Sequence, residues 1–125
     1  MTNAKTDIAE ENLAKMLSVW NTTDKDEQRA LVDAAMEHNV HFVDPNHNII
    51  GRDAFLAMVD EVQGKIPGAV YSRSSRVDFQ NNHSRYHWSI HLNDKLLIAG
   101  FDMSEVNDAG KIVKVVGFFG LLDRE

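Results

Sequence analysis

Residues 83–92 read HSRYHWSIHL, and their pattern indicates the structure of the second half of the chain. The large apolar side chains Tyr86, Trp88 and Ile90 occupy every second position, and His87 and other polar residues lie between them. Alternation with a period of two is typical of a β-strand with one apolar and one polar face. We therefore expect Trp88 to point toward the protein core and His87 to point away from it.

Two more strands are expected after this one, each preceded by a turn. Residues 93–94 (Asn-Asp) are a hairpin signal, and an apolar strand follows over residues 96–106. Residues 107–110 (Asn-Asp-Ala-Gly) turn the chain again, and a last strand follows over residues 112–122. The second half therefore predicts an antiparallel meander.

The first half of the chain is expected to be helical. Ala9, Leu13, Met16, Leu17 and Trp20 recur at helical spacing, so they share one face of a first helix. The polar residues 21–23 (Asn-Thr-Thr) interrupt this pattern.

A second helix is expected to start at Asp24 and to continue through His38. Glu27 lies in its first turn, where the helix dipole favours an acidic residue. A short strand follows at residues 40–43, and the Asp44-Pro45 pair ends it.

A third helix is expected after Gly51, ended by Gly64 and by residues 67–68 (Pro-Gly). Three helices followed by a meander indicate an α+β fold in which helices cover one face of a sheet.

Length and composition narrow the class of protein further. The 125 residues suit one domain spanning residues 1–125, and the net charge of -6 argues against a nucleic-acid partner. There are no cysteines, so disulfides and thiol nucleophiles are excluded. No apolar run is long enough to cross a membrane, and residues 1–11 do not resemble a signal peptide. We expect a cytoplasmic protein without a membrane partner.

The six histidines do not predict a metal site. His83, His87 and His91 are spaced by four, which on a strand separates them by about 13 Å, beyond the reach of one ion. Neither a Gly-rich phosphate loop nor a Gly-x-Ser-x-Gly nucleophile elbow is present. We therefore expect neither metal nor cofactor.

Two carboxylates have unusual sequence surroundings. Asp44 closes a short apolar strand, and Asp102 lies inside the apolar strand that begins at residue 96. A buried acid has a raised pKa and is a candidate for proton transfer or hydrogen-bond donation. The alternatives are a cap or turn role for Asp44 and a solvated strand-edge charge for Asp102. The aromatic residues Trp20, Tyr86, Trp88, Phe118 and Phe119 are likewise open to two readings, core packing or the lining of a ligand cavity.

Several segments, taken in order, carry a family resemblance. They are residues 42–45 (Phe-Val-Asp-Pro), 51–55 (Gly-Arg-Asp-Ala-Phe), 100–102 (Gly-Phe-Asp), 110–112 (Gly-Lys-Ile) and 117–120 (Gly-Phe-Phe-Gly). Over essentially the whole chain the sequence resembles the SnoaL-like polyketide cyclases and ketosteroid isomerases of the nuclear-transport-factor-2-like (NTF2-like) superfamily. The resemblance implies a cone-shaped curved antiparallel sheet wrapped around N-terminal helices, the cystatin-like α+β barrel, with a pocket between sheet and helices.

The resemblance also implies roles for the two carboxylates. In ketosteroid isomerase one Asp is the general base, and a protonated Asp beside a Tyr forms the oxyanion hole. Asp44 matches the base and Asp102 matches the protonated Asp. The isomerase Tyr would fall near Met16, which has no hydrogen-bond donor, whereas the cyclases work without that Tyr.

A pocket of this kind is expected to hold a small apolar or ring-containing molecule. The function predicted is an isomerase or cyclase that abstracts a proton from a carbon acid, and the alternative is a non-catalytic ligand-binding or dimeric interaction module. Ile112, Val116 and Phe118 would face outward on the last strand, which predicts a homodimer through the convex sheet. The expected ligand-binding residues are Met16, Trp20, Phe55, Met58, Val59, Tyr86, Trp88, Ile90, Val115 and Phe119.

Overall fold

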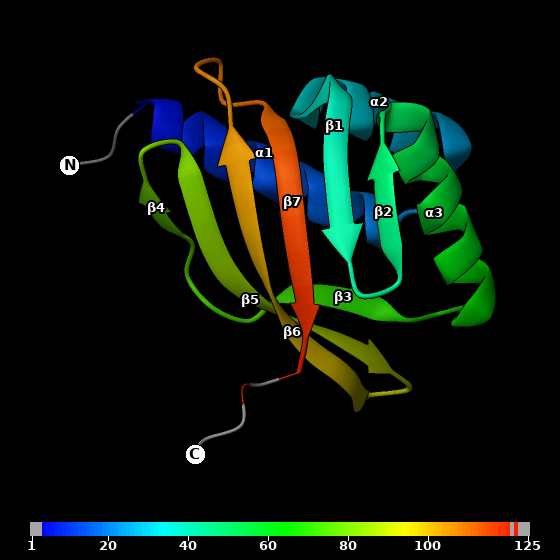
Figure 1. The fold of residues 1–125 in the computed structure, drawn as a ribbon. Coiled ribbons are helices and arrows are strands. Elements are labelled where there is room, and N and C mark those ends of the chain that lie inside the picture. The colour runs from blue at the N-terminus through cyan, green and yellow to red at the C-terminus, as the bar shows by residue number, and fades with distance from the viewer. Residues whose placement is uncertain (1–3, 121, 123–125) are drawn as a thin grey trace.

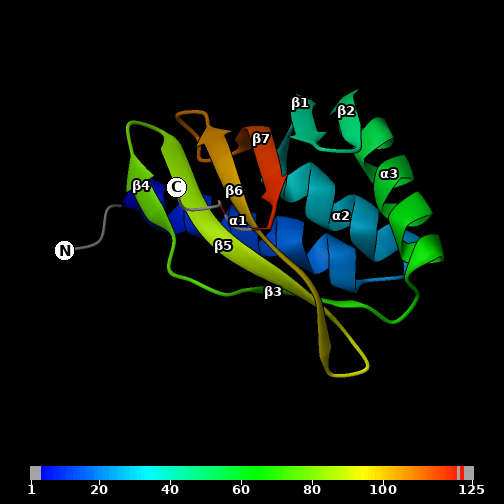
Figure 2. The same cartoon turned by 60° about the horizontal axis from the view of Figure 1, so that its bottom comes forward.

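Three helices pack against the concave face of one curved sheet in the computed structural model, which describes residues 4–120 and 122. Helix α1 (Ala4–Asn21) runs across the sheet, and α2 (Lys25–Ala35) and α3 (Arg52–Lys65) lie toward one end of it (Figures 1 and 2). The strands of the described residues are β1 (Met36–Asp44), β2 (His47–Ile50), β3 (Val70–Arg73), β4 (Asp78–Gln80), β5 (His83–Leu92), β6 (Lys95–Val106) and β7 (Ile112–Phe119). The predicted α+β class with a curved sheet is confirmed.

The sheet differs from the predicted meander in one pairing. Its strand order is β2-β1-β7-β6-β5-β3, and β4 also pairs with β5. Strands β5, β6 and β7 form the expected antiparallel meander, but β1 pairs with β7 in parallel. The prediction of a wholly antiparallel sheet was therefore wrong at this pair, because the pairing joins segments about 70 residues apart and leaves no local turn signal.

The two faces of β5 are as predicted. Tyr86 and Ile90 are buried, Trp88 is half-buried on the same face, and His87 is exposed on the other face. Ile112 is an exception, since it is fully buried instead of facing outward. The β6–β7 register shifts between Glu105 and Val106, and this irregularity turns Ile112 to the concave face.

Several element boundaries differ from the sequence expectations. Helix α2 ends at Ala35, so His38 belongs to β1 instead of to the helix. Strands β2, β3 and β4 were not predicted, because each has four residues or fewer and too little alternation to detect. The last strand ends at Phe119, and Leu121, which was expected within it, lies outside the described residues.

The turns around β5 share one backbone conformation. Asn93 and Asp94 have φ values of 52° and 64°, as the predicted hairpin requires. Asn81 and Asn82, with φ values of 48° and 64°, form a matching turn between β4 and β5. Asn and Asp tolerate this left-handed region better than other side chains. Turn chemistry at both ends therefore sets the register of the strand that carries Tyr86 and Trp88.

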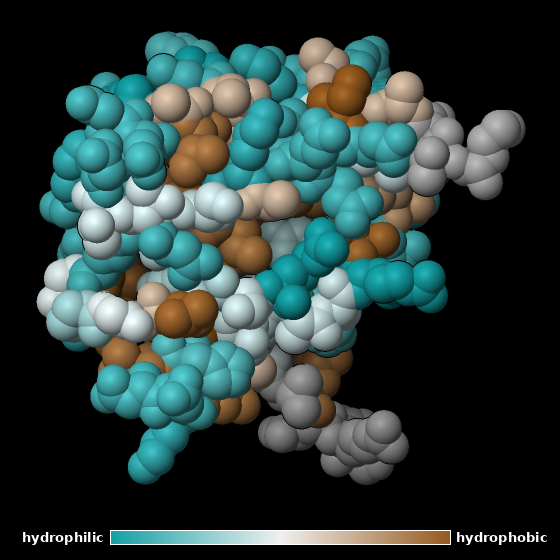
Figure 3. All heavy atoms as spheres, turned by 180° about the vertical axis from the view of Figure 1, so that it is seen from behind, coloured by the Kyte–Doolittle hydropathy of each residue, from teal (hydrophilic) through white to brown (hydrophobic). Residues whose placement is uncertain are grey.

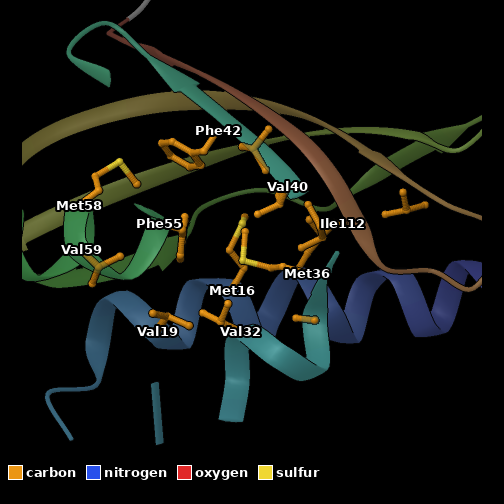
Figure 4. Packing of buried hydrophobic residues seen from close by; sticks show 14 of the residues in the cluster. Met16, Val19, Val32, Met36, Val40, Phe42, Phe55, Met58, Val59 and Ile112 are labelled. Atoms are coloured by element: carbon orange, nitrogen blue, oxygen red, sulfur yellow. The ribbon is translucent and has the colours of Figure 1, made fainter. Parts of the chain in front are cut away.

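The core lies between the helices and the β1–β7 end of the sheet (Figure 4). Helix α1 buries one stripe, which includes Leu13, Met16 and Val19. Phe55 of α3 is fully buried and makes an edge-on contact with Phe42 of β1, with ring centroids 5.5 Å apart. This packing closes one end of the cone and leaves the other end open for a cavity.

None of the described helices is long and apolar enough to cross a membrane.

Two glycines should respond oppositely to alanine substitution. A Cβ on Gly100 would lie 2.1 Å from the Trp88 ring and 2.4 Å from the Phe118 carbonyl oxygen, whereas a Cβ on Gly64 has open space around it. We expect Gly100→Ala to lower the free energy of unfolding by about 3 kcal/mol, because the crowded sheet must shift. Gly64→Ala should raise it by about 0.5 kcal/mol, because Ala favours the helix. Urea unfolding of both variants tests this, and equal effects would contradict it.

Candidate functional site

A cavity of about 550 Å³ opens between α1, the end of α3 and the concave face of the sheet. Its wall is mainly apolar and aromatic, with Met16 and Trp20 from α1, Val62 from α3, and Ile90 and Ile98 from the hairpin of β5 and β6. Figure 3 shows the helical side of the molecule, where hydrophobic side chains appear between the hydrophilic residues that cover most of this face. An apolar cavity with a few polar groups is the usual form of a small-molecule site.

Asp102 lies on β6 with its carboxyl group inside this cavity. Tyr86 is its cross-strand neighbour on β5, and the Tyr86 hydroxyl donates to Asp102 Oδ2 at 2.9 Å. The Trp88 indole Nε1–H donates to Asp102 Oδ1, also at 2.9 Å. Both carboxyl oxygens are therefore held by aromatic side chains of the neighbouring strand.

Burial changes the acidity of Asp102. Loss of water raises its pKa to about 6, the hydrogen bonds from Tyr86 and Trp88 oppose this rise, and the nearby Asp44 charge adds to it. Burial, together with Asp102, also raises the pKa of Tyr86 well above its usual value, so the Tyr86 hydroxyl stays a donor. The direction of this shift and two of its causes, burial and the Asp44 charge, agree with the expectation from the sequence, whereas the hydrogen bonds from Tyr86 and Trp88 were not expected.

Asp44 lies at the end of β1, and its side chain is 9% exposed. One oxygen, Oδ1, accepts a hydrogen bond from the Asn46 backbone N–H at 2.8 Å and another from His47 Nδ1 at 2.9 Å. Among the described residues, no donor is bonded to Oδ2. Two donors on one oxygen fix the orientation of the carboxylate and leave the second oxygen available as a base.

The two acidic residues lie on either side of Gly117 of β7. A Cβ on Gly117 would lie 2.9 Å from Asp102 Oδ1 and 3.6 Å from Asp44 Cβ, so both acids flank the same point of the wall. Asp102 pairs directly with Gly117 across β6 and β7. The missing side chain at residue 117 is therefore what allows the two acids to approach each other.

The structure places most of the predicted ligand-binding residues in the cavity wall. Met16 and Trp20 lie there on α1, Tyr86, Trp88 and Ile90 on β5, and Phe119 on β7. The remaining four were misplaced by the sequence prediction, since they are buried in the core and do not line the cavity; they are Phe55, Met58, Val59 and Val115. Three of the four are on α3, whose apolar face packs toward β1 and α1, so that only residues near its end, such as Val62, reach the cavity. Val115 is on β7 and packs in the same core.

The sequence analysis missed several wall residues, and three of them contact the acids or aromatic rings of the site. Phe42 belongs to the strand predicted at 40–43, but its inward direction had no signal there. His47 pairs with Asp44 across the two-residue turn 45–46, so a hairpin interpretation of that turn would have brought the two together. Tyr71 lies on the unpredicted strand β3 and stacks on Trp20, with ring centroids 5.2 Å apart.

No group of three His, Asp or Glu side chains within residues 4–120 and 122 is arranged to hold a metal ion.

Solved structures share this architecture. A SnoaL-like family protein from Agrobacterium tumefaciens, assigned as an isomerase, is 28% identical, with a TM-score of 0.84 over 92% of this chain and 99% of that one. An NTF2-like protein of unknown function from Exiguobacterium is 18% identical, with a TM-score of 0.71 over 87% and 98% of the two chains. A protein from Jannaschia, assigned as a SnoaL-like polyketide cyclase, is 10% identical, with a TM-score of 0.76 over 95% and 90%.

No protein-family model matches the sequence, and neither does any curated protein. The SnoaL-like resemblance found in the sequence is nevertheless confirmed by the Agrobacterium tumefaciens structure. The NTF2-like and cystatin-like descriptions of other solved structures agree with the predicted fold.

The acidity of Asp102 can be measured directly. We expect its carboxyl carbon to titrate with a midpoint near pH 6 by NMR. Tyr86→Phe removes a hydrogen bond that stabilises the charged form, so the midpoint should rise. Tyr71→Phe is the matched control, because Tyr71 is not bonded to Asp102, and it should leave the midpoint unchanged. A midpoint near the ~3.9 of an ordinary Asp would show that the carboxyl group is solvated.

Proposed function

We propose that this SnoaL-like protein catalyses proton transfer at a carbon next to a carbonyl group, as an isomerase or cyclase does, with Asp44 as the base and Asp102 as the hydrogen-bond donor. The observation that carries the proposal is the pair of carboxyl groups in different environments within one apolar cavity. Asp44 is held by two hydrogen bonds to Oδ1, and its Oδ2 has no bonded donor among the described residues. The pKa of Asp102 is raised to about 6. Two carboxyl groups in different environments are the usual arrangement for paired base and donor roles.

The step follows from the hydrogen bonds already described. Asp44 Oδ2 takes a proton from the carbon acid, and the electron pair of the broken C–H bond moves into the carbonyl group to form an enolate. Protonated Asp102 donates to the enolate oxygen, while Tyr86 and Trp88 keep its two oxygens in place. Asp44 then returns the proton to the same carbon or to another one, which completes an isomerisation.

The ligand class follows from the wall of the cavity. Trp20, Phe42 and Trp88 present aromatic surface to the cavity, and the side chains that bond to the two acids are His47, Tyr86 and Trp88. A small ring-containing ketone suits such a wall. The isomerase assignment of the Agrobacterium tumefaciens protein, which is similar over nearly its whole length, supports this choice. No cofactor takes part in the proposed step. We place the protein in the cytoplasm as part of this proposal.

Catalysis can be tested with 2-tetralone, a bicyclic ketone that has an acidic benzylic C–H bond. In D₂O the protein should accelerate exchange of this hydrogen for deuterium, followed by ¹H NMR. Asp44→Asn removes the base and should lower the accelerated rate by at least about 100-fold. Asp78→Asn changes an exposed carboxylate on β4 and should leave the rate unchanged.

The pH dependence of this exchange adds an independent check. Asp102 must be protonated to donate, so the rate should fall as the pH rises above about 6. Asp102→Asn keeps a neutral donor at every pH and should abolish that fall. If 2-tetralone binds but exchanges no faster with the wild type than with Asp44→Asn, the protein is a non-catalytic ligand-binding module.

We propose further that the protein is a homodimer through the convex face of the sheet. This face carries an apolar patch made of Phe101, Met103, Val116 and Phe118, with His87 at its border. Met103 and Phe118 are 46% and 51% exposed. Half-exposed large apolar side chains that adjoin one another are typical of a surface that a second copy covers.

The dimer is tested by adding a charge to this patch. Phe118→Asp should convert the protein from twice the chain mass of 14.1 kDa to the single chain mass, because the aspartate cannot be buried at low cost. Light scattering at micromolar concentration measures this. Ile8→Asp, at a 45% exposed position on α1, is the control and should leave the mass unchanged. A wild type of single chain mass would refute the dimer.

A further inference from the structure

Tyr71 contributes a polar group that the proposed reaction does not use. It lies on β3, beside Ile90 of β5, and it lines the cavity. The residue is 8% exposed, and its hydroxyl oxygen is buried with no hydrogen-bond partner among residues 4–120 and 122. It is the one buried side-chain nitrogen or oxygen of that part of the chain without a partner. A buried donor that has lost its hydrogen bonds to water and has no other partner is unfavourable, so we expect a ligand atom to accept a hydrogen bond from it.

The backbone holds Tyr71 firmly in this position. The Asn21 side chain at the end of α1 accepts from the Tyr71 N–H at 2.8 Å and donates to its carbonyl oxygen at 2.8 Å. The Tyr71 ring also stacks on Trp20, at an interplanar angle of 30°. A side chain fixed by two backbone hydrogen bonds and an aromatic contact is preorganised to present its hydroxyl group.

The Tyr71 hydroxyl is a separate polar point from the carboxyl pair. It bonds to neither Asp44 nor Asp102, whereas Tyr86 bonds directly to Asp102. Burial by itself raises the pKa of Tyr71 to about 12, while the Asp102 charge contributes to the raised pKa of Tyr86. The cavity therefore has an acidic end at Asp44 and Asp102 and, away from it, the buried Tyr71 hydroxyl in a wall that is mainly apolar.

We infer that Tyr71 selects the ligand, by donating a hydrogen bond to a second oxygen that the ring compound carries away from its reacting carbonyl group. The inference rests on the proposed function, because it takes the carbon acid to lie at the carboxyl end of the cavity. The expected ligand is a ring compound with two oxygen-containing groups. One is the reacting carbonyl group beside the two acids, and the other accepts a hydrogen bond from Tyr71. A compound without that oxygen leaves the Tyr71 hydroxyl buried and without a hydrogen bond, so it should bind less tightly.

The test compares two rigid bicyclic probes. Decalin-2,6-dione has a carbonyl group on each ring, so one carbonyl remains for Tyr71 whichever end enters first. In 6-methylidenedecalin-2-one a C=CH₂ group replaces the distal C=O with nearly the same shape. Quenching of Trp20 and Trp88 fluorescence, both in the cavity wall, measures the two affinities. The wild type should bind the dione about 3- to 10-fold more tightly than the methylidene analogue.

Tyr71→Phe removes the hydroxyl and keeps the ring that stacks on Trp20. We expect this variant to bind the two probes equally, with the affinity for the methylidene analogue unchanged from wild type. The ¹³C shift of the distal carbonyl carbon of the bound dione should move upfield in the variant, because the hydrogen bond is lost. Equal weakening of both probes, or no change for either, would overturn the inference.

Thermal unfolding without a ligand provides a second criterion. An unsatisfied buried hydroxyl stabilises nothing, so Tyr71→Phe should leave the Tm unchanged or raise it. A Tm lower by several degrees would show that the hydroxyl has a structural partner and would overturn the inference. Failure of the proposed catalysis is separate, since it would appear as unchanged deuterium exchange in Asp44→Asn while the preference for the dione persisted.

Discussion

The burial of the Asp102 carboxyl group between two aromatic donors is the constraint on which the rest of the site depends. A buried carboxyl group is unfavourable unless its oxygens are bonded, and Tyr86 and Trp88 satisfy one oxygen each. Both donors come from β5, so the register between β5 and β6 has to be correct to the residue. A slip of β5 by one position would turn Tyr86 and Trp88 to the convex face and leave Asp102 of β6 on the concave face without its donors.

Glycines complete the arrangement, because the site consists of adjacent rows across β5, β6 and β7. One row is Tyr86, Asp102 and Gly117, and the next is Trp88, Gly100 and Phe119. Gly117 leaves room for the acids, and Gly100 lets the Trp88 ring lie flat on the sheet, edge-on to Phe119 at 5.7 Å. Each row thus combines large side chains with one missing side chain, and the cavity wall follows from that alternation.

Much of this could be predicted from the sequence because it depends on local patterns. Alternation assigned Trp88 to the concave face, and the apolar context of Asp102 predicted its raised pKa. The parallel pairing of β1 with β7 and the inward turn of Ile112 could not be predicted, because each depends on a distant strand or a register shift. Tyr71 could not be predicted as a wall residue for the same reason, because β3 is placed at the cavity by its pairing with β5.

The helix and the sheet contribute different groups to the cavity. Helix α1 presents Met16 to the cavity, where the family resemblance expects a phenol, and Met16 cannot donate a hydrogen bond. Tyr86 bonds Asp102 from the sheet, and Tyr71 reaches the cavity from β3 while stacked on Trp20 of α1. Donors in this protein therefore come from the strands, and the helix supplies apolar surface. The β5–β6 register fixes Tyr86 on Asp102, whereas Asn21 and Trp20 of α1 hold Tyr71. Substitutions at other positions of α1, such as Met16, can therefore change the shape of the cavity without moving the hydrogen bonds to Asp102.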